Sequence, residues 1–300
     1  MHLEKIGVLG CGLMGAGIAQ TAARAGFPTI VREIDRELLD KGIDRIFAFI
    51  DKGIARGKTT VIERRKVSNH LAGAIEMEDL TDCDIIIEAI PENLELKREM
   101  FRALDNMVGV DTIFASNTSS LKIADIACAS KRKDKFIGTH FFNPVPLMKL
   151  VEVVRTEDTS DETFDAVMDF ILAIDKVGVA CVDTTGFVVN RLLTPYLLDA
   201  IRAFEAGIAS VEDIDNAVTL GLGYPMGPLT LIDFIGLDTV HHIAGIMTGE
   251  FRLSQYESPR LLRLMVEKGW YGKKSKIGFY DYSTEQPTPN DSELKKIIQE

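Results

Sequence analysis

Cysteine is scarce in this sequence, and long apolar runs are absent from it. The four cysteines lie far apart among 300 residues, with no CxxC or Cys/His ligand spacing, which argues against a zinc site or a disulfide framework. The longest apolar stretches, such as residues 85–87, are strand-sized and fall well short of the ~18 residues of a membrane span. The N-terminus shows no signal or transit pattern, so we expect a cytoplasmic protein with reduced thiols.

Positive charge is in the minority. The chain has 34 Lys and Arg residues against 45 Asp and Glu residues, which gives a formal net charge of −11. Nucleic acids and anionic membranes attract basic surfaces, so we expect no nucleic-acid partner and no membrane partner. Hydrophobic residues make up 46% of the chain and charged residues 26%, which is typical of a globular protein with about two domains.

The first 184 residues alternate short β-type runs with helical patterns, which predicts a parallel sheet in an α/β domain. The predicted strands are Ile6–Leu9, Thr29–Arg32, Asp84–Ile90, Thr112–Ser116, Phe136–Phe142 and Leu150–Arg155. Between the second and third of them, apolar residues recur at steps of three and four from Leu39 to Ile54. The chain then reverses after Gly57 into a second helix from about Thr60, so we expect an inserted helical hairpin.

Residues 185–300 show helical patterns only and are expected to form an all-helical second domain. The predicted helices are Phe187–Ala206, Val211–Leu220, Pro228–Met247 and Pro259–Lys268. Thr185 is placed to cap the first of them, and Pro195 should kink it or move its boundary. The tail from Glu285 carries two prolines and is expected to pack loosely.

A glycine-rich loop lies between the first predicted strand and an alanine-rich helix at residues 16–25. Gly10-Cys11-Gly12-Leu13-Met14-Gly15 is a GxGxxG sequence, and in this context it is the dinucleotide fingerprint of a doubly wound, Rossmann-type sheet. Gly10 permits the tight turn, Gly12 lets a pyrophosphate approach, and Gly15 lets the helix pack on the strand. The alternative is a glycine turn that binds no nucleotide.

Glu33 ends the second predicted strand, eighteen residues after Gly15. Its carboxylate would accept hydrogen bonds from the adenosine ribose hydroxyls and would repel a 2′-phosphate, which favours NAD over NADP. The adjacent Arg32 weakens that preference.

His140 is the one histidine of five at the end of a predicted strand in the sheet domain, where doubly wound folds bind ligands. Histidine suits proton transfer from an alcohol and to a ketone. If the last two predicted strands pair as a hairpin centred near Pro146, His140 faces Glu152, which would orient the imidazole. The alternative is a structural His–Glu pair inside the sheet.

Three further features have both a functional and a structural interpretation. The polar run Ser116–Ser120 follows a strand and could serve a site or merely cap a helix. Asn190, on the first helix of the second domain, could serve the same site or form an interdomain hydrogen bond. The stretch 51–66 has a net charge of +4 and is either a solvated helical face or a binding site for a polyphosphate group.

These motifs together resemble the short-form L-3-hydroxyacyl-CoA dehydrogenase family, which includes the bacterial 3-hydroxybutyryl-CoA dehydrogenases, over nearly the whole chain. The motifs that carry the resemblance are Gly10–Gly17, Glu88–Asn93, Ala115–Leu121, His140–Pro146, Asp183–Pro195 and Gly223–Pro228. The family commonly has Asp where this chain has Glu33, and the longer side chain keeps the charge.

The resemblance implies reversible hydride transfer between NAD(H) and C3 of a (3S)-3-hydroxyacyl-CoA or 3-ketoacyl-CoA of short chain length. It implies that His140 is the general acid–base, that Glu152 orients it, and that Ser119 and Asn190 hold the substrate 3-oxygen and the imidazole. The residues that it places near NAD are Gly10, Gly12, Leu13, Met14, Gly15, Glu33, Glu92, Lys97, Asn143 and Lys274. It places Lys52, Arg56 and Ser119 near CoA, and it implies a homodimer formed through the helical domain.

Two other functions are compatible with parts of this pattern. A dehydrogenase of a free sugar acid or hydroxy acid would share the fold and the catalytic set, but it has no CoA phosphates for the basic hairpin to bind. A non-catalytic NAD(H)-binding protein would have no need of the complete set of His140, Glu152, Ser119 and Asn190.

Overall fold

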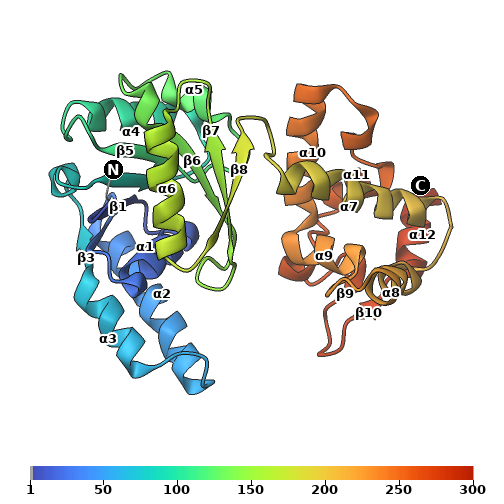
Figure 1. Cartoon of the computed structure of the whole chain (residues 1–300). Helices are drawn as coiled ribbons and strands as arrows, with labels where there is room; N and C mark the ends of the chain where they lie inside the picture. Colours follow the sequence, from blue (N-terminus) through green and yellow to red (C-terminus); the bar gives the residue numbers. More distant parts are fainter. Residues whose placement is uncertain (1–2, 300) are drawn as a thin grey trace. The chain divides into compact units, whose positions relative to one another are not determined.

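The structure is a computed structural model that describes residues 3–299 (Figure 1). It divides into two compact units, the first ending at Phe187 and the second beginning at Val188. The sequence predicted this boundary between residues 184 and 185, three residues earlier. Met1, His2 and Glu300 lie outside the described residues.

The first unit is built on an eight-stranded sheet in the order β3-β2-β1-β4-β5-β6-β7-β8. All neighbouring strands are parallel except β6 and β7, which form an antiparallel hairpin. The order from β3 to β6 is that of a doubly wound Rossmann sheet, so the predicted fold class is confirmed. The strands are β1 Ile6–Leu9, β2 Thr29–Arg32, β3 Leu71–Ala74, β4 Ile85–Glu88, β5 Ile113–Ser116, β6 Phe136–Phe141, β7 Leu150–Arg155 and β8 Val177–Val182.

Helices cover both faces of this sheet, and Figure 1 shows α6 crossing in front of it. Along β4, Ile85 and Ile87 belong to the core under α1, α2 and α6, whereas Ile86 belongs to the core under α4 and α5. Strands covered on both faces need apolar residues at every position, which explains the continuous isoleucine run. The helices are α1 Leu13–Ala25, α2 Arg36–Ala55, α3 Val61–His70, α4 Leu94–Asp105, α5 Ile123–Ala127 and α6 Asp161–Ala173, with short 3₁₀ helices at Met77–Leu80 and Lys133–Lys135.

The predicted helical hairpin is confirmed as α2 and α3, which project together from the sheet between β2 and β3 (Figure 1). Asp35 caps α2 by accepting a hydrogen bond from the backbone N–H of Leu38. Thr60 caps α3, and Glu63 accepts in return from the Thr60 backbone, which completes a capping box. After the chain reverses near Gly57, α3 therefore begins directly after Thr60, which stabilises the first turn of the helix.

The predicted strands are all present, with ends that differ by at most two residues, but β3 and β8 escaped prediction. Strand β3 reads Leu-Ala-Gly-Ala, a sequence with weak strand preference that pairs only because β2 lies beside it. Helix α1 begins at Leu13, three residues earlier than expected. The glycine loop therefore leads directly into the first helical turn.

The second unit is a helical bundle with one short β-ribbon. Its elements are α7 Val189–Glu205, α8 Val211–Leu222, α9 Pro228–Ile235, α10 Leu237–Phe251, a 3₁₀ helix Ser254–Tyr256, α11 Arg260–Glu267, a 3₁₀ helix Lys273–Ser275, β9 Tyr280–Asp281, β10 Thr288–Pro289 and α12 Asp291–Gln299. Pro195 lies inside α7. Among residues 3–299, no single helix is long and apolar enough to cross a membrane, and only the bent pair α9–α10 reaches that length and composition jointly.

Three expectations for this unit are wrong. The predicted helix over 228–247 is two helices at 94° to each other, because Gly236 between them has a φ of +106° that no α-helix contains. Thr185 does not cap α7, whose N-cap is Val188. The tail is not loosely packed, because Leu294 and Ile297 bury one face of α12 in the core of the unit.

A buried carboxylate joins α9 to the β-ribbon of the second unit. Asp233 is 1% exposed and accepts hydrogen bonds from the backbone N–H groups of Phe279 and Tyr280, both at 2.9 Å. The hydroxyl of Tyr282 donates to the same carboxylate at 3.1 Å. The Asp233 carboxylate therefore accepts three hydrogen bonds, which hold α9 against residues 279–282.

We predict that Asp233→Asn lowers the free energy of unfolding of this unit by about 2 kcal/mol, because an amide turns N–H groups toward donors that then lack an acceptor. Urea unfolding followed by Trp270 fluorescence measures it, because Trp270 packs on the second-unit core and is the one tryptophan of the chain. The control is Asp199→Asn, since Asp199 is an exposed carboxylate paired with Arg202 and should matter by less than about 0.5 kcal/mol. Equal effects of the two substitutions would contradict the assignment.

Candidate active site

The loop between β1 and α1 has the geometry that a bound diphosphate needs. Gly10 has a φ of +90°, and a Cβ on Gly15 would lie 1.8 Å from the Gly10 carbonyl oxygen, so both positions require glycine. A Cβ on Gly12 would meet no atom within 4 Å, so the surface above it is open. Gly12 is also the N-cap of α1 and gives that helix no side-chain cap. Unpaired N–H groups at a helix N-terminus under open space fit the pyrophosphate of a dinucleotide.

Glu33 lies beside the same loop, at the carboxyl end of β2. Its carboxylate accepts hydrogen bonds from the backbone N–H groups of Cys11 and Ile34, both at 2.8 Å. The Nε of Arg32 donates at 2.8 Å to the carbonyl of Ile75, just beyond β3. The glycine loop therefore has a carboxylate at its side, while the neighbouring guanidinium is anchored elsewhere.

His140 and Glu152 are register partners across the β6–β7 hairpin, so the predicted facing of these two residues is confirmed. Nδ1 of His140 lies 2.7 Å from Oε2 of Glu152, and both side chains are buried. Phe142 and Phe187 pack against the imidazole, with ring centroids at 4.5 and 5.7 Å. When Nδ1–H donates to the carboxylate, the ring is held in one tautomer and Nε2 faces away from Glu152 to exchange a proton.

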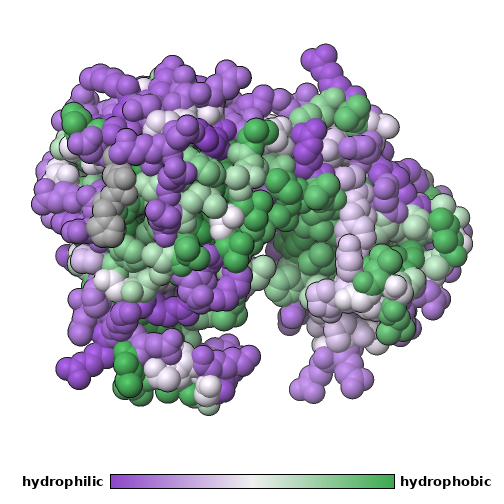
Figure 2. Space-filling view, in the orientation of Figure 1, coloured by the Kyte–Doolittle hydropathy of each residue, from purple (hydrophilic) through white to green (hydrophobic). Residues whose placement is uncertain are grey.

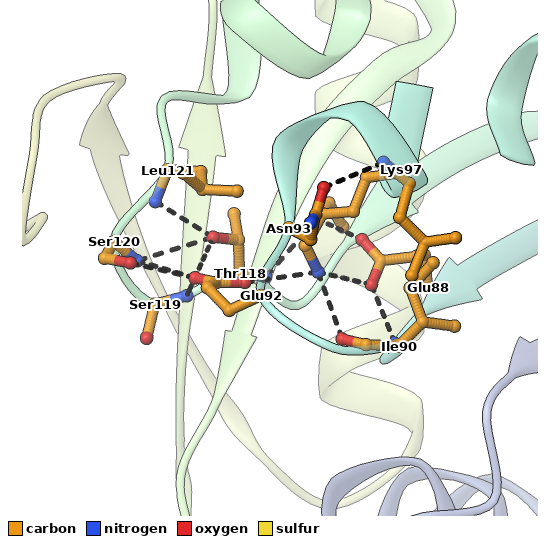
Figure 3. A network of polar contacts seen from close by, with 11 residues as sticks. Glu88, Ile90, Glu92, Asn93, Lys97, Thr118, Ser119, Ser120 and Leu121 are labelled. Atoms are coloured by element: carbon orange, nitrogen blue, oxygen red, sulfur yellow. Dashed lines mark hydrogen bonds and ion pairs between the residues drawn. The ribbon is translucent and has the colours of Figure 1, made fainter. Parts of the chain in front are cut away.

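A buried ion pair follows β4 at the same edge of the sheet (Figure 3). The Nζ of Lys97 lies 2.5 Å from Oε1 of Glu88, and neither side chain is more than 1% exposed. The hydroxyl of Ser116 donates to the other Glu88 oxygen at 2.7 Å, and the backbone N–H of Ile90 donates to the first at 2.8 Å. The Lys97 amine also donates to the Ile90 carbonyl.

Glu92 links this ion pair to residues 117–121, which we call the polar segment. Its Oε2 lies 3.2 Å from Nζ of Lys97. Its Oε1 accepts from the Thr118 and Ser120 hydroxyls at 2.5 and 2.9 Å, and from the Ser119 and Ser120 backbone N–H groups at 3.1 and 3.2 Å (Figure 3). Burial raises the pKa of Glu92, but Lys97 and the two hydroxyls outweigh burial and hold the pKa below its usual range. A charged Glu92 therefore fixes the segment that carries Ser119.

These groups meet at one edge because the strands are in register. Leu9, Glu88, Ser116 and Gly138 form one row across β1, β4, β5 and β6, and each except Gly138 is the last residue of its strand. His140 lies two residues further along β6. The glycine loop, the Lys97 ion pair, the polar segment and His140 are therefore all at the carboxyl edge of the sheet, where doubly wound folds bind ligands.

A basic pocket of about 240 Å³ lies between α1, α2, α3 and the loop at residues 142–149, which we call the β6–β7 loop. Its lining includes four cations, Arg24, Lys52, Arg56 and Lys58, and one acid, Glu63. Pro146 and Leu147 of the β6–β7 loop also line it. The positive charge predicted for the hairpin is thus gathered at a hollow.

Part of the positive charge on the hairpin has a structural role. Arg64 pairs with Asp51 at 2.7 Å, and Lys66 donates to the carbonyl of Ala25 near the end of α1. The predicted contacts Lys52 and Arg56 remain at the pocket.

The remaining predicted site residues are dispersed. Asn143 follows β6 and lines a smaller hollow beside α1. Asn190 is in the first turn of α7, and the Nζ of Lys274 lies 2.6 Å from the carboxylate of Asp238, so both belong to the second unit. Their roles stay predictions. Within residues 3–299, no group of three His, Cys, Asp or Glu side chains is placed to hold a metal ion.

The sequence analysis included two further residues of the site within its motifs but did not single them out as candidates. Glu88 is the centre of the buried network, and its position was readable as a charge at the end of a strand covered on both faces, which must find a partner. Asn117 accepts a hydrogen bond from the backbone N–H of Phe141 through Oδ1 at 2.9 Å and so ties the polar segment to the strand of His140. No sequence signal distinguishes Asn117 from the hydroxyl residues that follow it.

Two family models and several relatives match nearly the whole chain, and they all name the same kind of dehydrogenase. The model of the 3-hydroxyacyl-CoA dehydrogenase NAD binding domain matches residues 5–184, and that of the C-terminal domain of the same dehydrogenases matches residues 186–282. The 3-hydroxybutyryl-CoA dehydrogenase of Clostridioides difficile is 43% identical over 279 residues, which is 93% of this chain and 99% of the relative. The human mitochondrial hydroxyacyl-coenzyme A dehydrogenase is 46% identical over 297 residues, covering 93% and 91%. The solved (S)-3-hydroxybutyryl-CoA dehydrogenase of Ralstonia eutropha has a TM-score of 0.91 at 38% identity, covering 94% of this chain and all of that one.

We predict that Glu92→Ala loosens the polar segment without unfolding the sheet. The amide N–H groups of Ser119 and Ser120 lose their acceptor, so their hydrogen exchange should accelerate about tenfold. Hydrogen-exchange mass spectrometry measures it, and Glu95→Ala is the control, since Glu95 lies in the first turn of α4, three residues after Glu92, but pairs on the surface with Arg98.

The charge assigned to Glu92 also predicts how hydrogen-exchange protection of the polar segment depends on pH. Because the folded-state pKa of Glu92 is lowered from 4.5, its contribution is complete above about pH 4.5 and is lost only as the pH falls through the lower folded-state value. Protection of the polar segment that already declined between pH 7 and 5 would contradict a charged Glu92.

Proposed function

Because this chain belongs to the 3-hydroxyacyl-CoA dehydrogenase family and is an NAD-dependent enzyme of that family, we propose that its substrates are short (3S)-3-hydroxyacyl-CoA and 3-ketoacyl-CoA esters such as acetoacetyl-CoA. The observation that carries the proposal is the buried His140–Glu152 pair at the sheet edge that also holds the glycine loop. The 3-hydroxybutyryl-CoA dehydrogenases that match nearly all of the chain support the short acyl chain.

His140 is the general acid–base of the proposed reaction. In the oxidative direction its Nε2 removes the proton of the C3 hydroxyl, and in the reductive direction the imidazolium returns that proton to the 3-keto oxygen. NAD(H), when bound, accepts or supplies the hydride at C3. Glu152 fixes the ring through Nδ1 and stabilises the imidazolium, because its buried carboxylate lies 2.7 Å away. Ser119 and Asn190 hold the 3-oxygen and the imidazole.

The chain's own residues would bind the cofactor in three places. Gly10, Gly12, Leu13, Met14 and Gly15 surround the pyrophosphate, and Glu33 accepts from the adenosine ribose. Glu92, Lys97, Asn143 and Lys274 serve the nicotinamide half. The internal contacts of Glu92 and Lys97 support a positioning role for both residues, since both are engaged with the polar segment or with Glu88.

The basic pocket is the proposed CoA site. Phosphate groups favour a hollow lined by several cations, and Lys52 in the last turn of α2 and Arg56 at its C-cap both line it. A free hydroxy acid would leave these cations without anionic partners, which favours the CoA ester over a sugar acid or other free acid. Ser119 would meet the acyl end of the same ligand.

We also propose that the protein is a homodimer formed through the second unit. That unit exposes several large apolar side chains, namely Leu192, Leu220, Leu222 and Phe234, and Figure 2 shows apolar areas on it. Exposed apolar surface of this kind is typical of subunit interfaces. The cytoplasmic location and the absence of nucleic-acid and membrane partners stay predictions.

The first experiment follows NADH oxidation at 340 nm with acetoacetyl-CoA, with NADPH and free acetoacetate run in parallel. We expect turnover with NADH and the CoA ester, at least about a hundredfold slower turnover with NADPH because of Glu33, and none with the free acid. Turnover of the free acid at a comparable rate would favour the hydroxy-acid alternative. Tight NADH binding without turnover of any substrate would favour a non-catalytic protein.

His140→Gln should lower kcat by about 10²- to 10⁴-fold and leave NADH affinity unchanged, since it removes the proton-transfer group from an otherwise intact site. Glu152→Gln should lower kcat less, because the base remains but loses its orientation and charge partner. Stopped-flow kinetics and an NADH fluorescence titration measure both effects, with Glu157→Gln, an exposed acid after β7, as control. A near-normal kcat in His140→Gln would falsify the assignment.

A further inference from the structure

Lys176 lies immediately before β8, and its charge has no part in the reaction described above. The residue is 4% exposed. Its Nζ donates to the backbone carbonyls of Val145 and Met148, each at 2.6 Å. Charge-assisted hydrogen bonds of this length are about twice as strong as neutral ones. One buried amine thus joins the start of β8 to two points of the β6–β7 loop.

The β6–β7 loop connects the strand of His140 with the basic pocket. Val145 is buried against α1, and a Cβ on Gly17 of that helix would come within 2.8 Å of it, so the loop rests on the helix there. Pro146 and Leu147, between the two carbonyls that Lys176 binds, line the pocket together with its cations. Leu147 is itself exposed, so packing alone does not hold the tip of the loop in place.

We propose that Lys176 is a positioning residue for acyl-CoA, because it holds the carbonyls of Val145 and Met148 and thereby fixes the Pro146–Leu147 wall of the basic pocket. The proposal rests on the proposed function for the identity of the ligand. It goes beyond that function because it assigns a role in acyl-CoA affinity to a buried lysine that contacts neither NAD nor acyl-CoA.

The surroundings of Lys176 make this contact sensitive to pH. Burial, Arg24 and Lys149 lower the pKa of Lys176 to about 8, and Asp175 opposes them. Lys149 is itself paired with Asp175 at 2.5 Å, and the two carbonyls favour the charged amine. Because the pKa is lowered, the amine is charged below about pH 8 and loses its charge, and much of its hold on the loop, as the pH rises through that value.

The test compares Lys176→Met with Lys135→Met, since Lys135 also lies immediately before a strand of the sheet, β6, but pairs with the exposed Asp111 at 3.0 Å. Butyryl-CoA is the probe, because it has the CoA group and a short acyl chain but no 3-oxygen to react. Lys176→Met should raise the Kd for butyryl-CoA and the KM for acetoacetyl-CoA about tenfold, change kcat less than KM, and leave the Kd for NADH within about twofold. Lys135→Met should leave all of these constants within about twofold.

Wild-type protein gives a second measurement that needs no variant. Its Kd for butyryl-CoA should be constant up to about pH 7.5 and should rise toward the Lys176→Met value by about pH 9.5, whereas the variant should show no such rise. A flat wild-type profile over this range overturns the proposal. So does a loss of NADH affinity in Lys176→Met as large as the loss of butyryl-CoA affinity, because that result shows general damage to the unit.

Hydrogen exchange separates failure of this inference from failure of the proposed function. In Lys176→Met the amides of Val145, Leu147 and Met148 should exchange faster than in wild type, whatever the ligand is. If wild-type protein neither binds butyryl-CoA nor reduces acetoacetyl-CoA, the proposed function fails, and with it the assignment of the ligand. If wild-type binding is tight and Lys176→Met changes neither exchange nor affinity, the inference about Lys176 fails alone.

Discussion

The buried ion pair between Lys97 and Glu88 organises the carboxyl edge of the sheet. Removing two charges from water costs several kcal/mol per ion, and their attraction offsets that cost only with short contacts and further hydrogen bonds. Both conditions hold, because the two groups are 2.5 Å apart and Ser116 and the Ile90 backbone N–H also donate to Glu88. The same lysine then holds Glu92, which holds the polar segment. The position of Ser119 therefore depends on the buried ion pair through Glu92, whose side chain is itself partly exposed.

A sheet covered on both faces explains why the remaining polar groups cluster as they do. Polar side chains in the middle of such strands have few partners, as the buried and unpaired hydroxyl of Thr139 in β6 shows, so the charged groups lie at strand ends or in pairs across strands. His140 and Glu152 satisfy each other across the β6–β7 hairpin. Antiparallel pairing in this hairpin brings an acid and a base side by side.

Local patterns predicted much of the fold and of the site, and tertiary contacts determine the rest. The glycine loop and Glu33 follow from residue spacing, and the pairing of His140 with Glu152 follows from symmetric placement about a turn. Glu88 and Lys97 lie on different elements, nine residues apart, and only the packing of α4 against the sheet reveals that they meet. Likewise, the apolar pattern of the sequence continues across Gly236, so it does not reveal that the helix ends there. The burial of α12 depends on contacts with core residues that are distant in the sequence.

The distribution of cations around the pocket also constrains how a long substrate is held. Arg64 and Lys66 have acceptors within the protein, whereas Lys52, Arg56 and Lys58 line the hollow, where they can bind phosphate groups. Pro146 and Leu147 of the β6–β7 loop, which starts at the strand of His140, line the same hollow. In an acyl-CoA ester, the phosphate groups and C3 lie toward opposite ends of one flexible chain. A fixed loop connects the basic pocket with the strand of His140, so it sets the distance between the bound phosphate groups and the base. Small displacements of reacting atoms have large effects on rate.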